Sequence, residues 1–394
     1  MNKQTLITLL LTIFIALLGI GIIIPVMPVF ATELGASGFS LGMIIAAFSI
    51  SRGLLQPVVG SLSDIWGRKR FLISGLIIYG FVGLIIPQAG SVLHLIVIRA
   101  FHGVGSAMIV PIAMAYMSFL APPDHEGRYM SYLNIAIFCG IGCGPMIGGV
   151  ASDLFGFASV FYIMAGLSFG ASGLVIVNMP VHPPGAGKNQ KSLLGNVSLM
   201  LKSRKTMGIL TARYATMIVM VPTMAFLPLL MNQKFAASGL QIGLVIALRT
   251  LANAALQFPC GKIADRYNKV VLLMAGCICL SGAIMCIPLA NSFTMILVIY
   301  GILGMGEAII WPVLGAYASK EGKEHYGHGT MMGIFSLAMS AGVFTGATLA
   351  GFAMDSWGMD FAFYTTASTV LCITLGAAMM INSGESRIAE RRIA

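Results

Sequence analysis

The chain has 394 residues, of which 58% are hydrophobic and 9% charged, and its formal net charge is +10. An ordinary soluble domain carries about 25% charged residues, so this composition excludes a water-soluble globular protein. Apolar runs of roughly 20 residues are long enough to cross a bilayer as helices. The sequence therefore predicts an all-α integral membrane protein.

Apolar segments recur along the whole chain and predict twelve transmembrane helices. The first segment is too long for a signal peptide, and no small-residue cleavage site follows it, so we expect it to be retained. In chain order the predicted spans are about 5–30, 38–62, 71–90, 92–120, 128–152, 157–180, 206–232, 240–262, 270–289, 292–318, 328–353 and 359–381.

Basic residues concentrate at the two termini and in the loops that follow even-numbered spans. The loops on the other side carry one, Lys234. Because basic loops stay in the cytoplasm, the protein is predicted to be a multi-pass protein of the cytoplasmic (inner) membrane with both termini inside. This placement of the charge argues against a nucleic-acid partner. The basic residues are Lys3, Arg68, Lys69, Arg70, Arg128, Lys188, Lys191, Lys202, Arg204, Lys205, Lys262, Arg266, Lys269, Lys320, Lys323, Arg387, Arg391 and Arg392.

The two halves of the chain repeat each other at a shift of 201 residues, and later of 202. The repeat predicts two pseudo-symmetric six-helix bundles, 1–180 and 206–382, with a cytoplasmic linker at 181–205 and a cytoplasmic tail at 383–394. Parallel repeats suit a transporter that rocks one half against the other around a midplane site. Within the linker, the stretch 192–201 is predicted to form a short helix. Matching pairs include Gly60 with Gly261, Asp64 with Asp265, Gly103 with Gly304, Pro111 with Pro312, and Asp153 with Asp355.

Several stretches carry motifs typical of one transporter family. Residues 60–70 read GSLSDIWGRKR, and Arg99 is followed by Gly103 and Gly105. The fifth predicted span contains Gly140, Gly144, Pro145, Gly148 and Gly149. Together these resemble the loop 2–3, fourth-helix and antiporter motifs of the major facilitator superfamily, in its twelve-span drug:proton antiporter branch.

The resemblance implies a major facilitator fold and proton-driven efflux of amphiphilic small molecules, as in bacterial quinolone and multidrug exporters. It also implies a conformational motif made of Gly60, Asp64, Gly67, Arg68, Asp265 and Arg266. Gly60 is expected to allow close helix approach, and Asp64 to contact basic loop residues or a helix end. His102 departs from the family pattern, which has Gln there, and spans one and seven carry no acid at depth.

No cofactor is expected beyond the proton gradient. The nearest approach to a phosphate-binding loop, at 185–188, lacks the required spacing and hydroxyl residue. We expect no metal and no catalytic residues. The expected partners are a small-molecule substrate, protons and lipid, and the expected state is a monomer.

Charged residues at membrane depth are costly and usually functional. Glu307 is the only acid deep in any predicted span, and Trp311 follows one turn later on the same face. The sequence predicts Glu307 as a proton carrier or cation contact in the substrate cavity. A structural role as partner of an arginine is the alternative.

Arg99, His102 and Ser106 form a stripe on span four and are predicted to face the cavity, with Arg99 and His102 in proton coupling. A structural hydrogen bond to backbone carbonyls is the alternative for Arg99. Arg52 on span two, and Arg249 with Asn253 on span eight, are assigned to substrate contact or to gating. Arg213 is placed nearer the membrane boundary.

Two rival interpretations remain open. Three deep arginines against one deep glutamate also suit a transporter of organic anions or lipid-like acids. A membrane-embedded enzyme or receptor is the more remote alternative, since no nucleophile or metal cluster stands out in the sequence.

Overall fold

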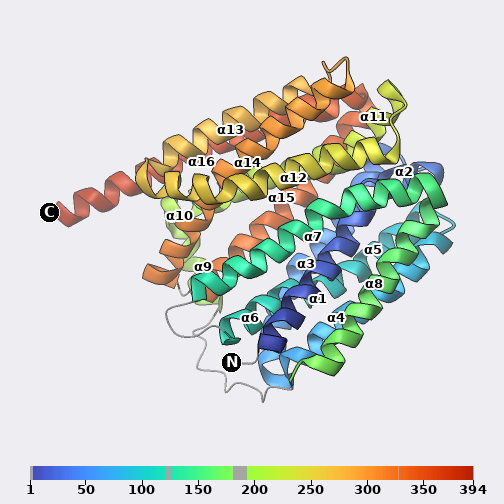
Figure 1. Ribbon diagram of the computed structural model, residues 1–394. Helices are drawn as coiled ribbons and strands as arrows, with labels where there is room; N and C mark the ends of the chain where they lie inside the picture. Colours follow the sequence, from blue (N-terminus) through green and yellow to red (C-terminus); the bar gives the residue numbers. More distant parts are fainter. Residues whose placement is uncertain (1–2, 121–125, 181–192, 327, 394) are drawn as a thin grey trace. The chain divides into compact units, whose positions relative to one another are not determined.

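The computed structural model describes residues 3–120, 126–180, 193–326 and 328–393. Within these ranges every regular element is a helix (Figure 1). Twelve helical segments of the described chain are long and apolar enough to cross a membrane. The predicted all-α membrane fold with twelve spans is therefore confirmed.

The chain divides into two compact units. The first comprises residues 1–187 together with 224–251. Its helices are α1 (Lys3–Ile23), α2 (Val26–Glu33), α3 (Gly38–Trp66), α4 (Arg68–Ile85), η1 (Ile86–Gln88), α5 (Val92–Ala107), α6 (Val110–Leu120), α7 (Glu126–Phe155), α8 (Phe157–Asn178), α11 (Leu227–Phe235) and the first part of α12 (Gly239–Arg266).

The second unit comprises residues 188–223 together with 252–394. The sequence repeat, by contrast, assigns 224–251 to the second half of the chain. Besides the rest of α12, this unit contains α9 (Leu193–Lys202), α10 (Arg204–Ile218), α13 (Lys269–Cys286), α14 (Phe293–Glu321), η3 (Gly322–Tyr326), α15 (His328–Trp357) and α16 (Met359–Ile393). The π-helical turn η2 (Pro222–Phe226) includes residues of both units. Helix α9 agrees with the short helix predicted in the linker, and α16 continues beyond the predicted span into the predicted tail.

Prolines interrupt the predicted spans one, four and seven. A proline lacks the amide hydrogen of a helix, and its ring clashes with the carbonyl four residues earlier. Helix α5 ends at Ala107 and α10 at Ile218, each four residues before a proline, Pro111 and Pro222. Pro312, the repeat counterpart of Pro111, lies inside the continuous helix α14.

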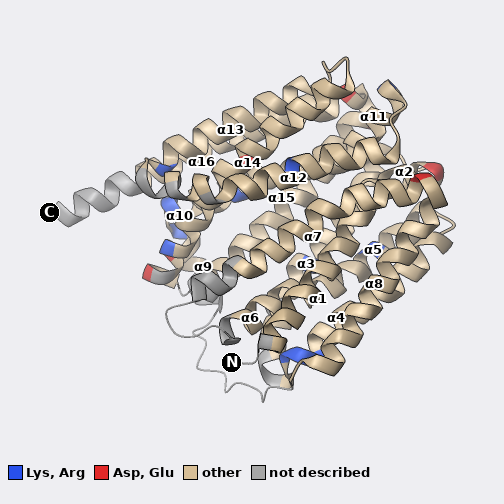
Figure 2. Ribbon diagram, viewed as in Figure 1, with Lys and Arg blue, Asp and Glu red and all other residues tan. Residues whose placement is uncertain are grey.

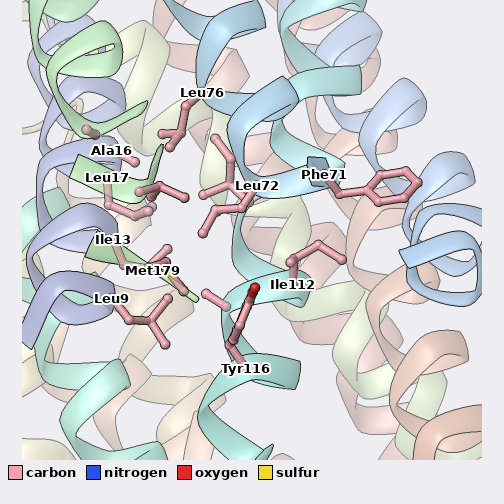
Figure 3. Packing of buried hydrophobic residues seen from close by; sticks show 14 of the residues in the cluster. Leu9, Ile13, Ala16, Leu17, Phe71, Leu72, Leu76, Ile112, Tyr116 and Met179 are labelled. Atoms are coloured by element: carbon pink, nitrogen blue, oxygen red, sulfur yellow. The ribbon is translucent and has the colours of Figure 1, made fainter. Parts of the chain in front are cut away.

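Part of the core of the first unit is formed by α1, α4 and α6, whose apolar side chains meet in Figure 3. Leu9 and Ile13 are spaced four apart on α1, and Leu72 and Leu76 on α4, so each pair shares a helix face. All four side chains are fully buried. Because lipid is as apolar as these side chains, close packing rather than exclusion from water stabilises the contact.

Among the described residues, charged ones sit mostly near helix ends, and the helices between are largely uncharged (Figure 2). Large side chains such as Leu154, Val177 and Met379 are about 70–80% exposed. Such surfaces are unfavourable in water but suit the hydrocarbon of a bilayer.

Candidate functional site

Arg99 and His102 form a buried pair on α5 of the first unit. The helix is capped by Ser91, whose hydroxyl accepts a hydrogen bond from the amide of His94. Arg99 is 8% exposed and His102 is fully buried. Nη1 of Arg99 lies 2.8 Å from Nδ1 of His102. Ser106, the third residue of the predicted stripe, is also buried. Of the three residues, Arg99 is the one that lines a cavity among the described residues.

The hydrogen bond fixes the state of His102. A guanidinium has five donors and no acceptor, so Nδ1 of His102 accepts and the ring is neutral with its proton on Nε2. Nε2 has no hydrogen-bond partner among the described residues. The imidazole lies edge-on to Phe48 and Tyr79, with ring centroids 5.1 and 4.3 Å away. Protonating His102 would set two donors against each other and break the bond to Arg99.

Two glycines explain how these rings reach His102. A Cβ on Gly103 would collide with Ser51 and with the backbone of α3 at Phe48. A Cβ on Gly105 would meet Tyr79 on α4 at 2.9 Å. The glycines that resemble the fourth-helix motif thus allow α5 to approach both neighbouring helices, which places Phe48 and Tyr79 against His102.

Arg99 also lines a cavity of about 110 Å³ in the first unit. Its guanidinium carbon lies 4.4 Å from the ring centre of Phe48, while that of Arg52 lies 5.7 Å from the same ring. The remaining lining residues of the described chain are apolar. They are Ile20, Ile23, Ile24, Met27, Pro28, Leu41, Ile44, Ile45, Met224 and Ala225.

Glu307 lies on α14 in the second unit and is 5% exposed. Nδ2 of Asn253 donates to Oε2 of Glu307 over 3.4 Å, and Nε2 of Gln257 donates to Oδ1 of Asn253 over 2.9 Å. The structure therefore brings two predicted cavity residues, Glu307 and Asn253, into one hydrogen-bonded chain. The adjacent Gly306 packs closely on α13, since a Cβ there would lie 3.2 Å from the carbonyl oxygen of Gly276.

Arg213, expected nearer the membrane boundary than the other arginines, lies on α10 within the span Arg204–Phe235. Its guanidinium carbon lies 5.8 Å from the ring centre of Trp311 and 4.8 Å from that of Phe335, and Nη2 donates to Sδ of Met339 over 3.1 Å. In the sequence, Arg213 could be recognised as a candidate because it is a charged residue inside an apolar segment. Trp311, predicted to line the cavity, is thus a contact of Arg213.

Arg249 is fully buried on α12, one turn before Asn253. Its helix face is the one that carries Asn253 and Gln257 at the following turns. Arg249, predicted with Asn253 for substrate contact or gating, is the largest fully buried side chain of the described chain.

The loop between α3 and α4 contains Gly67 and Arg68 of the predicted conformational motif. Gly67 has φ of 94°, in the left-handed region that favours glycine, and separates the two helices. Nη1 of Arg68 donates to the carbonyl of Ala115 over 2.8 Å. Nζ of Lys69 donates to the carbonyl of Ile176 near the end of α8 over 2.8 Å, where a cation is favoured by the helix dipole.

The structure says less about the other residues of the conformational motif. A Cβ on Gly60 would meet no atom of the described residues within 4 Å, so these residues show no close helix approach at Gly60. The side chains of Asp64, Asp265 and Arg266 lie outside the described residues.

The residues that resemble the antiporter motif form two close-packed faces of α7. Gly140, Gly144 and Gly148 are four apart and face α1, where added Cβ atoms would collide with backbone. Gly149 and Pro145 face the start of α12 instead, since a Cβ on Gly149 would run into the backbone of Gly239 and one on Gly243 into the carbonyl of Pro145. Such surfaces allow two helices to pack with their backbones close together.

Asp153 ties α7 to the same end of α12. Its two carboxylate oxygens accept hydrogen bonds from the amides of Gly239 at 2.9 Å and Leu240 at 3.0 Å. These amides belong to the first turn of α12 and have no partner within the helix. An acid is also favoured at this end by the helix dipole, which gives the repeated aspartate a physical role.

A buried ion pair, missed by the sequence analysis, lies in the second unit. Lys205 was counted among the basic linker residues, but its Nζ lies 3.0 Å from Oε1 of Glu321, and both side chains are less than 10% exposed. The hydroxyl of Thr206 donates to the other carboxylate oxygen over 3.2 Å. The pair joins the start of α10 to the end of α14.

Lys205→Met is expected to lower the thermal stability of the protein strongly. Among the described residues it would leave the buried Glu321 carboxylate with Thr206 as its hydrogen-bond partner, and breaking a buried pair costs about 3–5 kcal/mol. Adding Glu321→Leu should recover most of the loss, because an apolar pair removes the uncompensated charge. Thermal unfolding of detergent-purified protein would measure both effects. The exposed Lys320 nearby supplies the control, Lys320→Met, and an equal drop in both single variants would contradict the prediction.

Comparison with known proteins gives a consistent identification. The sequence profile of the Major Facilitator Superfamily matches residues 9–233 and 207–389. An uncharacterised MFS-type transporter of Methanocaldococcus jannaschii is 30% identical over 356 residues, covering 89% of this chain and 91% of the relative. Multidrug resistance protein 2 of Bacillus subtilis is 27% identical over 366 residues, covering 90% of each chain.

The fold has a matching solved structure. A bacterial homologue of the human lysosomal transporter Spinster, in an inward-facing and unoccupied conformation, has a TM-score of 0.79 at 13% identity. The match covers 97% of this chain and 96% of that one. The chain belongs to the Major Facilitator Superfamily.

Proposed function

We propose that this protein is a proton-coupled exporter of amphiphilic small molecules that works by alternating access. The observation that carries the proposal is Glu307, a buried carboxyl group within a membrane span, held by the amide of Asn253. An ionisable group at membrane depth is the usual proton carrier of a secondary transporter. The similarity to a multidrug resistance protein supports export as the direction.

Transport by purified protein in liposomes tests this proposal. An imposed pH gradient, acidic inside, should drive uptake of a fluorescent amphiphile into these proteoliposomes, and a protonophore should abolish it. Equal transport rates with and without the gradient would contradict proton coupling. Absence of any transport over a broad substrate panel would contradict the exporter assignment.

The proposal includes the orientation in the membrane. We propose that both termini and the linker at 181–205 face the cytoplasm, that the protein acts as a monomer in the inner membrane, and that it needs no cofactor other than the proton gradient. The distribution of Lys and Arg supports the orientation. A single cysteine introduced at Lys191, in a variant without the native cysteines, should resist membrane-impermeant maleimide in intact cells. Labelling from outside would overturn the orientation.

A further inference from the structure

We propose that the exported molecules are amphiphilic anions and that their charged group binds Arg99 in the apolar cavity of the first unit. This inference rests on the transport function proposed above and names the substrate class of that transporter. Carboxylates and other small oxyanions attached to an aliphatic or aromatic body are the chemistry that fits.

The first argument is the unbalanced charge of Arg99. Arginine stays protonated in proteins, and at 8% exposure this guanidinium has lost most of its water. Within the described residues no acidic side chain forms an ion pair with Arg99, and its Nε has no hydrogen-bond partner. Its protein hydrogen bond goes to neutral His102, which supplies no negative charge.

The sequence shows that few acids are available to this unit. All acids of 1–187 and 224–251 lie at or near predicted loops or helix ends. They are Glu33, Asp64, Asp124, Glu126 and Asp153. Of these, Asp153 is already bound to the amides of Gly239 and Leu240.

The surroundings compensate the charge only in part. The ring of Phe48 attracts the guanidinium of Arg99, but a cation–π contact contributes about 2 kcal/mol when desolvated. The effective penalty for burying an ion is several kcal/mol. Arg52, near the same ring, adds a second cation whose Nε lacks a hydrogen-bond partner among the described residues. A bound anion would remove this imbalance.

The second argument is the shape and lining of the cavity. Among the described residues that line it, Arg99 is the one that carries a charge, and the others are apolar. A planar guanidinium matches the two oxygens of a carboxylate, while Ile20, Ile44 and Met224 offer contacts for hydrocarbon. At about 110 Å³ the cavity is smaller than the roughly 300–1,000 Å³ of typical ligand pockets. It would therefore hold the charged group and the first carbons of a larger molecule.

Binding of three matched probes tests the substrate class. Octanoate, octyltrimethylammonium and octanol share a chain and differ in the head group. The full-length protein in lipid nanodiscs should bind octanoate at least tenfold more tightly than either of the others in calorimetric titration. Equal affinities, or a preference for the ammonium compound, would overturn the inference.

Variants of Arg99 test the site. Arg99→Met should weaken octanoate binding at least tenfold. Arg99→Lys should retain part of the affinity, because lysine keeps the positive charge but lacks the planar guanidinium that matches two carboxylate oxygens. The control is Arg204→Met, which removes an exposed arginine outside the quoted motifs and should leave the affinity unchanged. Unchanged affinity in Arg99→Met would overturn the assignment of the site. If Arg99→Met does not fold, Arg99→Lys tests the site instead. Wild-type affinity for octanoate in Arg99→Lys would overturn the proposal that the guanidinium of Arg99 binds the carboxylate.

These experiments separate the inference from the function on which it rests. Binding in nanodiscs needs no gradient, so a selective anion site without gradient-driven flux would refute proton coupling and keep the substrate class. Gradient-driven export of a cationic amphiphile, with no binding of octanoate, would keep the exporter and refute the anion site.

Discussion

Glu307→Gln is expected to abolish substrate export driven by a pH gradient while leaving substrate binding and passive exchange in place. Glutamine has nearly the shape of a protonated glutamate but cannot release or take up a proton. The amide nitrogen of Asn253 can donate to the glutamine oxygen as it donates to Oε2 of Glu307. The variant should therefore fold and behave as a carrier fixed in its protonated form.

The expected loss of the substrate gradient is large because Glu307 is proposed to carry every coupled proton. Moving one proton through 100 mV supplies about 2.3 kcal/mol, and 1.4 kcal/mol corresponds to a tenfold ratio. One coupled proton can thus sustain a substrate gradient of roughly fiftyfold. Without coupling, the ratio of substrate concentrations across the membrane should fall to that of passive equilibrium.

Proton and substrate fluxes measured in the same proteoliposomes would check this result. Glu307→Asp keeps a carboxyl group and should retain part of the coupling. Glu33→Gln makes the same chemical change at an exposed acid and should transport like the wild type. Full gradient-driven export by Glu307→Gln would place proton coupling at another residue.

The helices themselves could be predicted from the sequence because local apolar length decides them. The same holds for the face shared by Arg99 and His102, since residues three apart on a helix are neighbours. Glu307 stood out for a similar reason, as a charge inside an apolar run. In each case the information lies within one helical segment.

Contacts between distant segments could not be predicted in this way. Lys205 and Glu321 are 116 residues apart, and only the fold shows that a lysine from a basic linker is buried against an acid. The contacts of Arg213 with Trp311 and Phe335 likewise join different helices, so the sequence of one segment could not predict them.

Gly148→Ala is expected to reduce both stability and transport sharply, because it adds one methyl group where α7 meets the backbone of α1. The new Cβ would run into the carbonyl of Ile22 and lie 3.0 Å from its Cα. Backbone atoms cannot turn aside as the end of a flexible side chain can, so the two helices must separate. Forcing extra volume into a packed contact typically costs about 1–3 kcal/mol.

The matched control for Gly148→Ala is Gly166→Ala on α8, where an added Cβ would meet nothing within 4 Å. Alanine is a better helix former than glycine by about 0.8–1.0 kcal/mol, so the control should unfold at the wild-type temperature or slightly above it. Gly148→Ala should unfold at a clearly lower temperature, and export in proteoliposomes should fall with it. If the two variants unfold together but only Gly148→Ala loses export, the glycine face serves motion between α1 and α7 rather than packing. If both variants keep wild-type stability and export, the close approach of α1 and α7 has no part in the transport cycle.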